Sequence, residues 1–238
     1  MIRTLFLSLT LSFAGHGLAQ APPAVPAQHS SHAPTHAAPP AAEVWDSLMA
    51  GNRRFVAGKP RARDLASLRH KLASGQSPKA IILSCSDSRV GPELIFDQSL
   101  GDLFVVRTAG NVAGAVALGS IEYAVDHLHS PLLVVLGHQK CGAVNAACSG
   151  EKMPSPNLDA IVERINPAVA QAKSYAKGDD LVESAIKENV HRSAADLLAN
   201  SEIIRNAVKS GTLTMIEAEY ELGTGQVVRL NAARSAQN

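Results

Sequence analysis

The chain has 238 residues, three cysteines, nine histidines and a formal net charge of +1. Charges of both signs are interspersed, so no sustained field attracts nucleic acid or an anionic membrane, and we expect a small-molecule partner. About 195 residues follow the atypical N-terminal fifth of the chain, which is enough for one domain with a full hydrophobic core.

Residues 1–21 predict a secretory signal peptide. Arg3 precedes an apolar stretch over residues 5–11, and small residues follow, where cleavage after Ala19 or Ala21 fits equally well. The alternative is an ordinary buried N-terminal helix. The apolar stretch is too short for a membrane span, so we expect a periplasmic or secreted protein with no span after signal cleavage.

Residues 22–42 consist almost wholly of Ala, Pro, His and Ser, which predicts a disordered tether. The tether contains His29, His32 and His36. These histidines form either a metal-gathering arm or a polar linker, and we favour the linker because flexible histidines fix no coordination geometry. One folded domain is then expected over residues 43–238.

The rest of the chain alternates strand-like and helical patterns. Short apolar runs suited to doubly buried parallel strands cover residues 80–83, 103–106 and 132–136. Helical spacing covers residues 42–57, 118–128, 158–165 and 182–198, and a final hairpin joins residues 213–218 and 227–230. The helix over 118–128 supplies a parallel crossover. We therefore predict an α/β fold with a mainly parallel central sheet flanked by helices.

Two of these strands lead directly into cysteine-containing segments. The first leads into Cys85, Asp87 and Arg89, and the third leads into His138 and Cys141. The carboxyl ends of parallel strands are where open α/β sheets place their ligand sites. Zinc binds thiolate and imidazole, and catalytic sites offer three protein ligands and leave the fourth position to water. We predict that Cys85, His138 and Cys141 bind Zn²⁺.

Asp87 and Arg89 are two residues apart in a loop, so their side chains can pair. They form either a structural ion pair or a catalytic dyad, in which Arg89 keeps Asp87 ionised to accept a hydrogen bond from zinc-bound hydroxide. Asp87 is also a possible fourth zinc ligand in a closed state.

A further helical run is predicted over residues 142–148, directly after Cys141. Cys148 lies seven residues beyond Cys141 on this helix, about 10 Å further along its axis. It can neither bind the same ion nor form a disulfide with Cys141, and we interpret it as a buried structural thiol. The remaining histidines show no ligand spacing and are interpreted as surface or core residues: His70, His127, His129 and His191.

The motif C-x-D-x-R followed by H-x-x-C resembles the β-class carbonic anhydrases, and the similarity extends over residues 44–230. The resemblance implies zinc bound by Cys85, His138 and Cys141, with Asp87 and Arg89 as the catalytic dyad. It also implies a homodimer or a tetramer, with pocket residues that reach a neighbouring subunit.

Members similar to the plant enzymes have three matching pocket residues, which here are Gln76, Phe104 and Tyr123. We also place Gly142, next to the last zinc ligand, among the substrate-binding residues. Without the resemblance, Phe104 and Tyr123 would be interpreted as packing residues, because both lie in predicted core elements.

The chain departs from the family pattern at two positions. Ala109 replaces a bulkier aliphatic residue, which predicts a wider pocket wall. Ile82 occupies the place of the Trp found in members with an inhibitory bicarbonate site, which puts such regulation in doubt.

The implied reaction is the reversible hydration of CO2 to bicarbonate and a proton. One alternative is hydrolysis of carbonyl sulfide or carbon disulfide on the same fold. Another is a non-catalytic periplasmic zinc-binding protein, which the Asp87–Arg89 pair disfavours, because zinc storage needs no oriented carboxylate. A zinc dehydrogenase is disfavoured because no G-x-G-x-x-G motif follows a strand.

Overall fold

The computed structural model describes residues 39–231, and its centre is a five-stranded sheet in the order β2-β1-β3-β4-β5. The strands are β1 (Ala80–Cys85), β2 (Leu103–Thr108), β3 (Leu132–His138), β4 (Thr214–Tyr220) and β5 (Val227–Arg229). The first four strands run parallel, and β5 pairs with β4 in the antiparallel sense. The mainly parallel sheet predicted from the apolar runs is confirmed.

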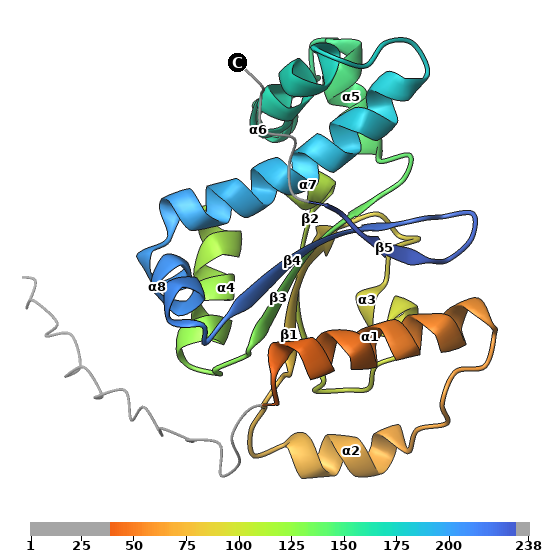
Figure 1. The fold of residues 1–238 in the computed structure, drawn as a ribbon, viewed down its shortest axis with the longest axis vertical. Coiled ribbons are helices and arrows are strands. Elements are labelled where there is room, and N and C mark those ends of the chain that lie inside the picture. The colour runs from red at the N-terminus through yellow and green to blue at the C-terminus, as the bar shows by residue number, and fades with distance from the viewer. Residues whose placement is uncertain (1–38, 232–238) are drawn as a thin grey trace, which may run out of the picture. The chain divides into compact units, whose positions relative to one another are not determined.

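Helices cover both faces of this sheet (Figure 1). They are α1 (Ala41–Val56), α2 (Leu65–Leu72), α3 (Pro92–Ile95), α4 (Ala115–Asp126), α5 (Gly142–Ser149), α6 (Pro156–Lys173), α7 (Asp180–Asn200) and α8 (Glu202–Ser210), with the 3₁₀ turn η1 (Ala109–Asn111). None of these helices within residues 39–231 is long and apolar enough to cross a bilayer.

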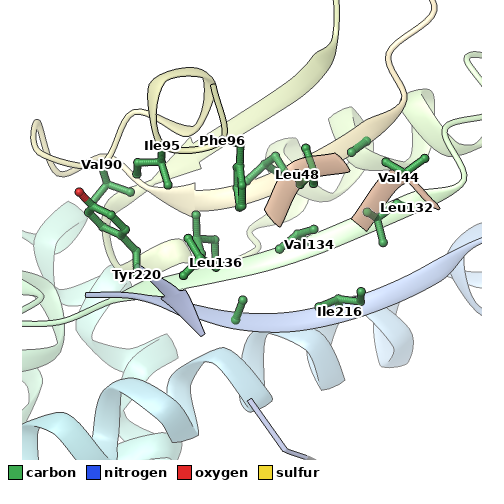
Figure 2. Packing of buried hydrophobic residues seen from close by; sticks show 14 residues of the cluster. Val44, Leu48, Val90, Ile95, Phe96, Leu132, Val134, Leu136, Ile216 and Tyr220 are labelled. Atoms are coloured by element: carbon green, nitrogen blue, oxygen red, sulfur yellow. The ribbon is translucent and has the colours of Figure 1, made fainter. Parts of the chain in front are cut away.

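One face of the sheet packs against α1. Val44 and Leu48 of this helix belong to one apolar cluster with alternate strand residues, among them Val134 and Ile216 (Figure 2). The other face is covered by α4, α7 and α8, whose apolar residues join Leu83 in a second cluster. Because both faces are covered, every residue of β1 and β3 is buried.

The structure contains two helices that the apolar periodicity did not predict. Helix α8 starts immediately after α7, where the Ser201 hydroxyl caps it by accepting a hydrogen bond from the Ile204 amide at 3.1 Å. Helix α2 has no buried residue and is capped by Asp64. Neither helix alters the order of the strands.

The pairing of β1 with β3 positions the candidate site. Ser84 lies opposite Leu136 in this parallel register, so the two strands end at the same edge of the sheet. Helix α7 packs closely over β3 at Gly137, where an added Cβ would lie only 2.4 Å from Val190 Cγ2. The carboxyl ends of two neighbouring strands therefore meet beneath α7.

Candidate metal centre

Three side chains converge where these strands end. Cys85 is the last residue of β1, His138 is the last residue of β3, and Cys141 is the N-cap residue of α5. The turn from β3 into α5 includes Lys140 with a positive φ of 53°. All three side chains are buried: Cys85 is 5% exposed, Cys141 is 1% exposed and His138 is inaccessible.

The geometry of these three side chains suits a tetrahedral metal. The sulfur atoms of Cys85 and Cys141 are 4.0 Å apart, and the ligand atoms of all three residues lie within 4.8 Å of one another. Zn–S bonds of about 2.3 Å at tetrahedral angles separate two sulfurs by about 3.8 Å. The pair of thiols is therefore spaced as two zinc ligands are.

His138 presents one specific nitrogen to this cluster. Its Nδ1 lies 2.8 Å from the carbonyl oxygen of Gln139, which selects the tautomer with the proton on Nδ1. Its Nε2 is buried and has no hydrogen-bond partner among the described residues. A buried nitrogen without a partner is costly, and a metal at this position would satisfy it.

The two thiols differ in acidity. The Cys141 thiol lowers the pKa of Cys85 to about 4 by hydrogen bonding, which outweighs the opposing effect of burial, and the Gly110 amide adds to the lowering. The Cys85 thiolate in turn raises the pKa of Cys141. One thiolate is thus formed at neutral pH, and binding of a divalent metal displaces the proton of the second.

Asp87 and Arg89 form a bidentate pair beside the cluster. Arg89 Nε donates to Asp87 Oδ1 at 2.9 Å, and Arg89 Nη2 donates to Asp87 Oδ2 at 2.7 Å. These bonds hold the pKa of Asp87 well below its usual range. Asp87 Oδ2 also lies 3.9 Å from His138 Nε2, so an ionised and oriented carboxylate borders the three candidate ligands.

Arg107 of β2 fixes the same loop, which the sequence analysis missed. Its Nε donates to the carbonyl oxygen of Cys85 at 2.9 Å, and its Nη2 donates to that of Asp87 at 2.6 Å. These bonds hold the backbone of both residues. A charged side chain in an otherwise apolar strand was the signal that could have identified it.

The residues expected to bind substrate do not all lie near this centre. Gly142 follows Cys141 and is exposed. Phe104 instead pairs with Ile81, close to the start of β1, and the exposed Gln76 precedes that strand. At about 3.3 Å per residue, Ile81 and the end of β1 are about 13 Å apart.

Tyr123 lies with Phe104, at a ring-centroid distance of 6.3 Å, and 44% of its surface is exposed. Tyr123 is therefore not enclosed in the core of the single chain, and its predicted role in substrate binding stays a prediction. Ile82 is fully buried in the cluster beneath α1, and Ala109 lies in η1.

The structure tests the prediction made for Cys148 but not those made for the N-terminal segment. Cys148 is only partly buried, so its interpretation as a buried thiol is wrong, although burial still raises its pKa. Its position on α5, which begins at Gly142, agrees with the helix predicted there. The signal peptide and the tether histidines His29, His32 and His36 lie outside the described residues.

Comparison with known proteins identifies the family. A family model described as "Carbonic anhydrase" matches residues 80–227. "Carbonic anhydrase 2" of Mycobacterium tuberculosis is 44% identical over 190 residues, which cover 78% of this chain and 90% of that protein. The carbonic anhydrase of Mycolicibacterium smegmatis is 41% identical over 188 residues, which cover 77% and 90%.

Solved structures agree with this assignment. The β-carbonic anhydrase CcaA is 27% identical with a TM-score of 0.64, and the match covers 82% of this chain and 94% of that one. A Coccomyxa β-carbonic anhydrase, solved with acetazolamide, is 26% identical with a TM-score of 0.63, over 79% and 82% of the two chains.

The parallel sheet and the Cys-His-Cys cluster define an α/β metalloenzyme of the type that activates water. The chain belongs to the carbonic anhydrase family, and its structural neighbours assign it to the β class. It is a lyase that hydrates CO2, and the carbonyl sulfide and storage alternatives are not favoured.

Proposed function

We propose that this carbonic anhydrase works with one zinc ion bound by Cys85 Sγ, His138 Nε2 and Cys141 Sγ. The observation that carries the proposal is the buried His138 Nε2, which has no partner among the described residues and faces two thiols. Zinc bound in this way lowers the pKa of a water molecule and so supplies the nucleophile for CO2.

Asp87 orients that nucleophile. Its carboxylate is ionised, borders His138 Nε2, and is available as a hydrogen-bond acceptor. Arg89 holds the carboxylate from the other side and keeps it from binding the metal itself, while Arg107 holds the loop backbone. The chain's own residues thus provide orientation and a hydrogen-bond acceptor at Asp87 Oδ2.

We propose further that a second copy of the chain completes the substrate pocket. Strand β2 is an edge strand, and Val116 and Tyr123, two turns apart on α4, are 87% and 44% exposed. Tyr123 and Phe104 lie together on this side, away from the chain's own Cys85. A twofold partner covering this face would bring these rings, and Gln76, to the other chain's metal centre.

Finally, we propose that the protein is exported to the periplasm or secreted. Residues 1–21 support this proposal, because a charged start is followed by an apolar stretch and then by small residues. The N-terminal sequence of the mature protein in a periplasmic fraction tests it. A protein that keeps Met1 in the cytoplasm would contradict export.

Replacing any of the three candidate ligands should remove zinc and activity together. Cys85→Ala, His138→Ala and Cys141→Ala should each fall from one zinc per chain to nearly none, because two remaining ligands hold the ion poorly. Metal analysis and CO2 hydration rates measure both effects. Cys148→Ser is the matched thiol control and should keep its zinc. Full zinc in the Cys85→Ala protein would refute the assignment.

Removing Arg89 should lower the rate without removing zinc. Arg89→Ala frees Asp87 to bind the metal or to misorient the nucleophile, so we expect a loss of about 10- to 100-fold. Higher pH favours the nucleophile over the carboxylate at the metal, so the variant should be closest to the native rate at alkaline pH.

The measurement is zinc content and CO2 hydration of Arg89→Ala and Asp87→Asn from mildly acidic to alkaline pH. Asp87→Asn keeps the side-chain shape but cannot bind as a carboxylate, so its loss should not recover at high pH. Native rates in both variants would show that Asp87 and Arg89 form only a structural salt bridge.

A charge on the exposed face of α4 should disrupt the assembly. Val116→Glu would place a carboxylate in the proposed interface, so we expect a monomer with intact zinc and little activity. Light scattering with size-exclusion chromatography measures the mass. Leu158→Glu, on exposed Leu158 of α6, is the matched control and should leave the mass unchanged. A Val116→Glu protein of native mass and rate would exclude this face as the interface.

A further inference from the structure

The loop after β2 directs a backbone amide at one candidate metal ligand. The Gly110 N–H donates to Cys85 Sγ at 3.3 Å. The donor lies in the turn η1, where Gly110 has a φ of 68° and Asn111 a φ of 46°. A Cβ on Gly110 would lie 2.8 Å from Ile165 Cδ1. Two consecutive residues with positive φ need support from their surroundings.

Helix α7 supplies that support through two side chains one turn apart. Asn189 Nδ2 donates to the carbonyl oxygen of Gly110 at 2.7 Å. One turn further along the helix, Ser193 Oγ accepts a hydrogen bond from Asn111 Nδ2 at 3.3 Å. Asn189 is only 1% exposed and comes from a helix 79 residues away in sequence.

A purely structural role does not explain an asparagine at this position. Its neighbours on α7, Ile186 and Val190, belong to apolar clusters. Asn189 Oδ1 is buried and has no hydrogen-bond partner among the described residues, which costs free energy that an apolar side chain would avoid. Among the described residues, the hydrogen bond that this amide makes is to the carbonyl oxygen of Gly110.

The helix itself does not depend on this bond. Lys187 of α7 lies 3.8 Å from Glu219 of β4, and His191 pairs with Glu217 one turn later. Val190 and Leu197 pack in the core cluster on the same side of the sheet. Loss of the Asn189 amide should therefore release the Gly110 loop and leave α7 in place.

We propose that Asn189 is a positioning residue for the metal centre. It holds the Gly110 peptide so that the N–H remains on Cys85 Sγ, and this bond stabilises the thiolate that binds zinc. The inference rests on the proposed zinc site. Outer partners that orient metal ligands typically change metal affinity by about 10- to 100-fold.

The test measures how fast the full-length zinc protein releases its metal to an excess of chelator. Asn189→Ala removes the donor, and Asn189→Leu keeps a branched side chain of similar shape without a donor or a buried charge. Both should release zinc about 10- to 100-fold faster than the native protein. Ser193→Ala is the matched control, because it breaks only the neighbouring bond to Asn111, and its release rate should stay within about twofold of native.

Replacing zinc with cobalt distinguishes a change in the position of the Cys85 ligand from a general loss of fold stability. The sulfur-to-cobalt charge-transfer band should shift in both Asn189 variants and stay at the native energy in Ser193→Ala. If Asn189→Ala does not fold, Asn189→Leu, which fills the same space without a donor, decides the matter.

Native release rates and native band energies in the Asn189 variants would overturn the role of Asn189 while leaving the zinc site intact. Equal acceleration in Ser193→Ala would also overturn it. A native protein that binds no zinc would overturn the proposed site as well.

Discussion

The parallel pairing of β1 with β3 is the constraint on which the rest of the site depends. These strands are adjacent and parallel, so Cys85 and His138 reach the same edge of the sheet although β2 and α4 lie between them in the chain. Cys141 follows after a short turn and begins α5. The ligand atoms of these three residues thereby lie within 4.8 Å of one another.

The charges around this edge are arranged to keep two thiols and a carboxylate close together. The Gly110 amide donates to Cys85 Sγ, Arg89 pairs with Asp87, and Arg107 donates to carbonyl oxygens of the same loop. The Gly110 amide and Arg89 stabilise negative charge that burial alone would penalise, and Arg107 holds the loop backbone. The site therefore depends on elements distant in sequence, namely β2, η1 and α7.

Much of this arrangement was predictable because local patterns matched the fold. Continuous apolar runs predicted β1, β2 and β3, and the positions of Cys85 and His138 at strand ends predicted their meeting. Helices α2 and α8 were missed, since the first buries no residue and the second begins directly after α7. Asn189 was missed because nothing in an apolar helical pattern shows which carbonyl group a buried amide will reach. The location of Tyr123 away from the chain's own site depends on tertiary structure, which no local spacing encodes.

X-ray absorption at the zinc edge of the purified full-length protein tests the central claim most directly, because it counts the ligand types around the metal. We predict one zinc per chain with two sulfur ligands at about 2.3 Å and nitrogen or oxygen ligands at about 2.0–2.2 Å. A spectrum with no sulfur ligand, or with four, would contradict a site made by Cys85, His138 and Cys141.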